Sequence, residues 1–166
     1  SSSNEKEAYA PNTSFVVVMF KHELCTFQCS FFVVEGDWVV VQADRGEHVG
    51  RVRSVSAEPP AFHVPSHILR HANFAEISSV EANHPLEEHA AQRIQQIVDD
   101  LQLPNLRITD TEFYSDGNKM TVFFSSKSTV DFRELQRRVF REFRRRIWLI
   151  NTAEVQYRNR NCRNRK

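Results

Sequence analysis

Arginine residues recur at helical spacing near the C-terminal end of the chain, where they could bind an anion. Steps of three and four residues bring side chains onto one face of a helix. Guanidinium groups gathered in this way repel one another unless an anion neutralises them, and phosphate matches their forked geometry. The spacing therefore predicts a surface for a nucleic-acid backbone on a helix over residues 131–146. Its members would be Arg133, Arg137, Arg141, Arg144 and Arg145.

The charge distribution agrees with a polyanionic partner. Residues 131–166 hold 12 basic and 4 acidic residues, whereas residues 1–130 hold 10 basic and 17 acidic ones, although the net charge is only +1. Such asymmetry favours an anionic partner. The alternative stays open, because an arginine run is often the solvated face of an amphipathic helix. It could also pair with an acidic protein, or with the acidic helix that contains Glu87 and Asp99.

Four arginines outside this helix could extend the basic surface. Arg51 and Arg53 alternate along a predicted strand and so face the same way. Arg45 lies in a turn that is either a functional loop or a simple hairpin connection in which Gly46 supplies a positive φ. Arg70 follows a proline-rich segment and could border a groove between two lobes.

Catalysis is the second hypothesis. Cleaving RNA needs a base, an acid and a cation near the phosphate. Each candidate also has a simpler structural role, such as a helix cap or a turn residue, and the sequence contains no Walker loop, nucleophile elbow or HExxH motif. No catalytic residue is therefore assigned. The candidates for an endoribonuclease are His48, His71, Asp116, Lys119 and Asp131.

Neither a metal nor a cofactor is expected. His22, Cys25 and Cys29 could be read as ligands, but residues four apart on a strand lie about 13 Å apart, too far for one ion. No apolar run reaches the length of a membrane span, so we expect no membrane segment. Three cysteines in a chain of this size favour a reducing compartment, and hence the cytoplasm. A homodimer is left open.

The helices and strands that must position these residues are expected to form one α+β domain over residues 14–157. Residues 14–57, rich in β-branched and aromatic residues, predict an antiparallel curled sheet or small barrel. The proline-rich residues 58–65 predict an extended connector, and residues 66–157 a second lobe of order α-α-β-β-α-β. A flexible leader over residues 1–13 and a basic, disordered tail over residues 158–166 should flank the domain.

Local signals place the elements of the second lobe. A short helix over residues 74–80 and a longer one beginning at Pro85 are expected. Asp-Gly chemistry at residues 116–117 predicts a hairpin between strands 106–114 and 119–125. Asp131 and Glu134 have the spacing of a capping box, and a final strand should cover residues 147–157. The buried side of the capped helix would consist of Phe132, Leu135, Val139, Phe140 and Phe143.

Several motifs resemble the polymerase-suppressor-protein C-terminal domain. They are Asp-Gly-Asn-Lys at residues 116–119, Val-Asp-Phe-Arg-Glu-Leu at 130–135, and Arg-Gly-Glu-His-Val-Gly-Arg-Val at 45–52. Arg70 with Ala72, and Arg146 with Ile147 and Leu149, also fit the pattern. The resemblance extends from the first strands to Ile150.

The resemblance implies an intracellular domain. Similar domains occur in bacterial RicT/YaaT-type regulators, which act in complexes that affect RNA processing, and in kinetoplastid cycling-sequence-binding proteins. The bacterial relatives carry cysteines associated with iron-sulfur clusters beyond the domain, whereas this chain has Cys162 alone there. Cluster binding is therefore not carried over.

Three hypotheses result. The first is an RNA-binding module in mRNA metabolism and post-transcriptional regulation that contacts the backbone of single-stranded RNA. The second is an endoribonuclease that acts in the same groove. The third is a non-catalytic scaffold that binds protein partners in an RNA-processing complex. Phe113, Tyr114, Trp148 and Tyr157 could stack on bases, although aromatic residues at strand spacing are more often part of the core.

Overall fold

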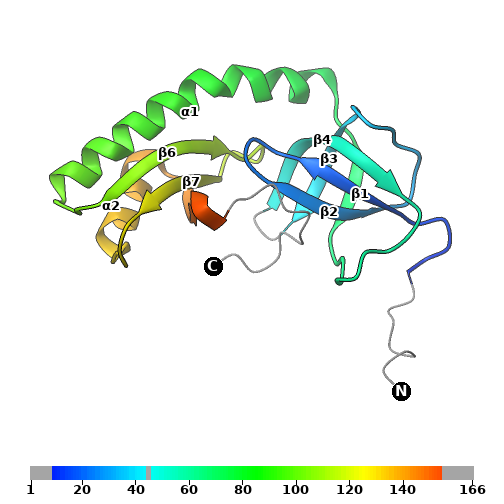
Figure 1. Ribbon diagram of the computed structural model, residues 1–166. Coiled ribbons are helices and arrows are strands. Elements are labelled where there is room, and N and C mark those ends of the chain that lie inside the picture. Colours follow the sequence, from blue (N-terminus) through cyan, green and yellow to red (C-terminus); the bar gives the residue numbers. More distant parts are fainter. Residues whose placement is uncertain (1–8, 44–45, 155–166) are drawn as a thin grey trace.

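The computed structural model describes residues 9–43 and 46–154 and divides them into a β-barrel and a lobe of helices on a sheet (Figure 1). The α+β class is therefore confirmed. Residues 1–8 of the predicted leader, Arg45, and the predicted tail, residues 158–166, lie outside the described residues. None of the described helices is long and apolar enough to cross a bilayer.

The barrel consists of strands β1 (Ser14–Met19), β2 (Leu24–Cys29), β3 (Trp38–Ala43), β4 (Gly46–Ser56) and β5 (His67–His71). They follow the order β1-β2-β5-β3-β4, and β4 pairs back with β1 to close the barrel. Alternate side chains point inward along each strand, so the β-branched residues fill the interior. Val16, Val18, Val39 and Val41 are completely buried there, around Phe27.

The predicted boundary between the lobes is wrong. Residues 67–71, expected in the second lobe, form β5, which pairs with β2 at Gln28 and with β3 at Val39. The proline-rich residues 58–65 thus connect two strands of the barrel. Prolines prevent pairing locally, but they carry no information about where the chain pairs next. Without β5, β2 and β3 would each leave an unpaired edge.

The second lobe begins with helix α1 (Phe74–Asp100) and continues with the hairpin of β6 (Leu106–Phe113) and β7 (Lys119–Ser126). Helix α2 (Arg133–Phe143), strand β8 (Arg146–Asn151) and the 3₁₀ helix η2 (Thr152–Glu154) follow. The sheet order is β6-β7-β8, and β8 runs parallel to β7. Both helices pack on one face of this sheet (Figure 1). Their shared core includes Ile94, Ile97, Met120, Val122, Leu135 and Val139.

One helix of 27 residues replaces the two that the sequence predicted before the hairpin. It starts at a capping box in which Asn73 Oδ1 accepts a hydrogen bond from Glu76 N and Glu76 Oε1 accepts one from Asn73 N, both 2.9 Å long. Pro85 lies inside the helix. Proline removes one backbone donor, but Pro85 and Glu81 are both exposed. Water can therefore bond the carbonyl group that Pro85 leaves without a partner, and the helix continues.

Helix α2 begins later than predicted and has no capping box. Its N-cap is Phe132, which makes no side-chain cap. Asp131 Oδ1 instead accepts a hydrogen bond from Arg133 N, 3.1 Å away, and the same carboxylate binds the Arg133 guanidinium. A local turn has thus replaced the cap, because aspartate can bond backbone donors two residues ahead. The predicted final strand ends at Asn151, and residues 155–157 lie outside the described part of the chain.

Candidate functional site

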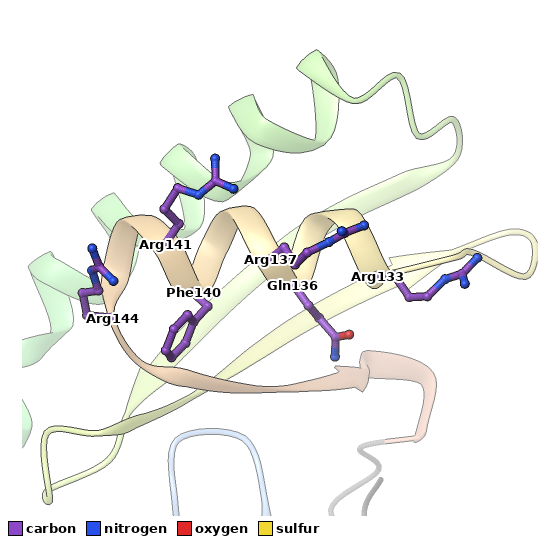
Figure 2. A pocket seen from close by; sticks show the side chains of 6 residues that line it. All are labelled: Arg133, Gln136, Arg137, Phe140, Arg141 and Arg144. Carbon is purple, nitrogen blue, oxygen red and sulfur yellow. The ribbon is translucent and has the colours of Figure 1, made fainter.

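Helix α2 presents a basic surface to solvent. Residues 131–146 contain seven arginines and three acidic residues. Six side chains line one shallow depression on the outer side of the helix (Figure 2). We call these residues the α2 basic surface: Arg133, Gln136, Arg137, Phe140, Arg141 and Arg144.

Two arginines of this surface have carboxylate partners, and two do not. Arg133 pairs with Asp131, and Arg137 pairs with Glu134. All four of these side chains are exposed, so the pairs contribute little to stability, and a phosphate could replace either carboxylate. The guanidinium of Arg133 lowers the pKa of Asp131 to about 2. Arg141 and Arg144 form no ion pair with any carboxylate in residues 9–43 and 46–154.

Phe140 belongs to the exposed surface and not to the core. It was predicted to be buried, but 51% of it is exposed, whereas Leu135 and Val139 are fully buried. Position 140 lies between the apolar stripe and the arginines, and the sheet is too narrow to cover it, because β8 is the edge strand. Phe140 and Gln136 point toward β8, whereas Arg141 points to the opposite side of the helix (Figure 2). An exposed ring among arginines can stack on a nucleic-acid base.

Beside Phe140, a groove runs between α2 and the edge strand β8. Arg146 and Trp148 contribute to its β8 side, and the Arg146 guanidinium lies 5.1 Å from the centre of the Trp148 ring. Phe132 and Gln136 contribute from the chain leading into α2 and from α2 itself. The groove thus adds a further cation and a partly exposed aromatic ring to the α2 basic surface.

Arg145 does not lie on the predicted surface. Its guanidinium stacks 4.5 Å above the Phe113 ring and donates a hydrogen bond to Lys119 O at 3.1 Å. Burial lowers the pKa of Arg145. Arg145 leaves the predicted surface because α2 ends just before Arg144, which adopts the left-handed conformation with φ 56°. The chain therefore turns there, and consecutive arginines point to different sites.

A cavity of about 540 Å³ lies between the barrel and the second lobe, and Arg145 is part of its wall. Lys21, in the turn between β1 and β2, crosses to the second lobe beside it. Its Nζ lies 3.0 Å from Glu87 Oε1 and 3.0 Å from Asp110, and donates to Thr111 O at 3.1 Å. Burial alone would lower the pKa of Lys21, but the hydrogen bonds to Asp110 and Glu87 outweigh it and raise the pKa. We call Lys21, Glu87 and Asp110 the interlobe clasp.

His48 is held in the wall of the same cavity. Its ring is stacked between Phe20, with a centroid distance of 5.2 Å, and Tyr114, at 4.2 Å. His48 Nε2 lies 3.1 Å from Glu112 Oε2. Burial alone would raise the pKa of Glu112, but the nearby His48 and the hydrogen bond from Lys21 N outweigh burial, and the pKa is lowered.

The five catalytic candidates do not form one centre. Asp116 pairs with Lys119 at 3.0 Å. His48 lies near this pair, because its Nδ1 is 3.5 Å from Oγ of Ser115, the residue before Asp116. His71 is on the barrel, where it lies 3.4 Å from Asp37. Lys119 starts β7, whereas Asp131 follows the far end of that strand and binds Arg133.

The remaining predicted arginines have different surroundings. Arg70 forms a two-bonded pair with Glu76, 2.7 and 2.8 Å long, which fixes it to the start of α1. Arg51 lines the interlobe cavity, whereas Arg53, on the same strand, does not line it and lies 4.0 Å from Met19 Sδ. His22, considered above as a metal ligand, instead lies 2.6 Å from Asp110 Oδ2.

The interlobe clasp was missed by the sequence analysis, although one signal was available. Glu87 lies on the same helical stripe as Ala90, Ala91 and Ile94, and it is buried. A charged residue within an apolar stripe needs a partner, because an unpaired buried charge is costly. This pattern could have predicted a buried ion pair, but it could not have identified Lys21 as the partner.

Comparison with known proteins gives two matches. The family described as the PSP1 C-terminal conserved region matches residues 66–151. The uncharacterized protein PB7E8.02 of Schizosaccharomyces pombe is 29% identical in an alignment 143 positions long, and the alignment covers 68% of this chain and 19% of that protein. The chain therefore spans about a fifth of the length of this relative. No solved structure matches the chain.

Proposed function

We propose that this chain, which belongs to the PSP1 C-terminal conserved region family, is an RNA-binding module that contacts single-stranded RNA through the α2 basic surface. The membership confirms the family expected from the motifs at residues 116–119 and 130–135. The observation that carries the proposal is the arrangement around Phe140. This exposed ring lines the same depression as four arginines, of which Arg141 and Arg144 have no carboxylate partner in the described part of the chain.

The dimensions of the surface suit a short stretch of backbone. Arg133 and Arg144 are eleven residues apart, which corresponds to about 16 Å along a helix. The arginines between them can contact successive phosphates, because each guanidinium offers several donors. Phosphate can also displace the exposed carboxylates of Asp131 and Glu134, since those pairs gain little in water.

Phe140 favours single-stranded RNA over a duplex and over an acidic protein. A base can stack on an exposed ring only when it is not already paired and stacked within a helix. An acidic peptide would use the arginines but would gain nothing specific from the ring. We expect this module to act in mRNA metabolism and post-transcriptional regulation, as the sequence resemblance implies.

Charge reversal tests the contribution of the arginines. The variant R141E/R144E should bind labelled single-stranded RNA roughly tenfold or more weakly than the wild type, with a shallower dependence on salt. The matched control is R107E/K127E, which makes the same charge change at two exposed positions of the second lobe that do not line the α2 basic surface. Fluorescence anisotropy over a series of salt concentrations measures both quantities. Equal affinity and equal salt dependence in the two variants would refute the proposal.

A second variant tests stacking. Stacking on an aromatic side chain is worth about 1–3 kcal/mol per base, so F140A should weaken binding by roughly 5- to 100-fold. The control is F74A, because Phe74 at the start of α1 is also exposed, at 85%, but lies outside the α2 basic surface. Loss of RNA affinity in R141E/R144E without any loss in F140A would favour an acidic protein as the partner.

A further inference from the structure

Two arginines from opposite lobes line the interlobe cavity. Arg51, on β4, donates from Nε to Gly36 O at 3.0 Å and lies 5.5 Å from the centre of the Trp38 ring. Arg145, after α2, donates to Lys119 O and lies over Phe113. Both walls of the cavity therefore present a guanidinium laid against an aromatic ring. An arginine has five N–H donors, so each of these side chains can bind a further acceptor.

The carboxylates of the cavity are already occupied by other groups. Glu87 binds Lys21 Nζ and accepts a hydrogen bond from Phe113 N at 2.7 Å. Glu112 accepts one from Lys21 N at 3.0 Å and lies beside His48. Glu76 is the third acidic residue that lines the cavity. It accepts two hydrogen bonds from the guanidinium of Arg70, which lies outside the cavity.

Neither Arg51 nor Arg145 therefore forms an ion pair with a carboxylate of the described residues. Asp116 and Glu87 offset the charge of Arg145 only from a distance, and burial outweighs them in lowering its pKa. Because Arg145 is half-buried and has no carboxylate next to it, an anion bound at this position would be stabilised. Phosphate is the anion whose geometry two guanidiniums match best.

The remainder of the cavity suits a planar ring. Trp38, Phe113 and Phe20 are half-buried in its walls, and the stack of Phe20, His48 and Tyr114 makes one wall rigid. Its volume, about 540 Å³, is in the range of sites for small ligands. Aromatic walls with a few fixed polar groups are typical of such sites.

We propose that the interlobe cavity is a nucleotide-binding site, in which Arg51 and Arg145 hold a phosphate and the aromatic walls hold the base. The ligand is either a free mononucleotide or the phosphorylated end of an RNA chain. The second source would connect the two sites, because Arg144 belongs to the α2 basic surface and the next residue, Arg145, to the cavity. The inference goes beyond the proposed function, since it concerns a separate site with a different ligand.

The test uses adenosine monophosphate and isothermal titration calorimetry on the whole chain. The wild type should bind it, and should bind adenosine roughly tenfold or more weakly, because adenosine lacks the phosphate. R51Q should weaken binding of the monophosphate by a similar factor without changing the binding of adenosine. R53Q is the control, because Arg53 is an exposed arginine of the same strand outside the cavity. R145K tests the contribution of Arg145 from the second lobe, and it keeps the positive charge at that position.

Competition distinguishes the two sources of phosphate. An oligonucleotide that displaces adenosine monophosphate only when it carries a terminal phosphate identifies the ligand as an RNA end. Displacement by mononucleotides alone identifies a free nucleotide. The inference is overturned if neither ligand binds, or if R51Q and R53Q bind adenosine monophosphate equally. Its failure is separable from failure of the proposed function, because RNA without terminal phosphates reports on α2 alone.

Discussion

Replacing Lys21 with methionine should destabilise the protein strongly, because it removes the cation of the interlobe clasp. The side chain of Lys21 is 19% exposed and that of Glu87 only 4%. Removing one partner of a buried ion pair leaves the other charge uncompensated, which costs about 3–5 kcal/mol. Because Lys21 and Asp110 are partly exposed, we expect about 2–3 kcal/mol. In a urea titration this corresponds to a midpoint lower by about 1 M.

Two tryptophans allow each lobe to be followed separately. Trp38 lies in β3 of the barrel and Trp148 in β8 of the second lobe. Their fluorescence can be measured individually in K21M variants that carry W148F or W38F, each compared with the same tryptophan variant of the wild type. In the wild type the two transitions should coincide, whereas K21M should separate them, because the clasp joins the lobes.

The matched control is K127M, since Lys127 is exposed and its side chain has no hydrogen bond or ion pair among the described residues. Adding E87Q to K21M removes the uncompensated charge and should restore part of the lost stability. The reasoning is refuted if K21M and K127M have the same midpoint. It is also refuted if E87Q makes K21M less stable.

Two further predictions concern a turn and a titrating group. Gly46 has φ 100°, and a Cβ there would lie 2.7 Å from Asp116 Oδ2, whereas Gly117, with φ 79°, has no such neighbour within 4 Å. G46A should therefore lower the free energy of unfolding by up to about 3 kcal/mol, and by more than G117A, which should lower it by about 1 kcal/mol; equal losses in thermal unfolding would contradict this. Burial alone would raise the pKa of Asp110, but hydrogen bonds from His22, Lys21 and Thr111 N lower it from 3.8 to about 2. This depressed pKa stabilises the folded state above about pH 4, by about 1–2 kcal/mol after solvent screening, and the contribution is lost as the pH falls toward about 2. The stability difference between the wild type and D110N should shrink over that window, and a difference independent of pH would exclude the assignment.

Local patterns in the sequence determined the class of the fold and most of its elements. Alternating β-branched residues specify strands that bury one face, so the barrel strands could be predicted. Asp116 and Gly117 specify the hairpin because Gly117 adopts φ 79°, which such a turn requires. The arginine spacing on α2 was also correct for Arg133, Arg137, Arg141 and Arg144, since helical periodicity depends only on near neighbours.

Contacts between distant residues decided the rest. Lys21 and Glu87 are 66 residues apart, and Arg51 and Arg145 reach the same cavity from different lobes. No local pattern identifies which later segment pairs with β2 and β3, so residues 67–71, which form β5, were assigned to the wrong lobe. The same limit explains Phe140 and Arg145: periodicity gives the angle of a side chain around a helix, but the width of the sheet beneath it and the turn at its end decide what that side chain meets. The residue types in the sequence thus determine which chemical groups the candidate site contains. The division of these groups between an exposed surface and a cavity arises only when the two lobes pack together.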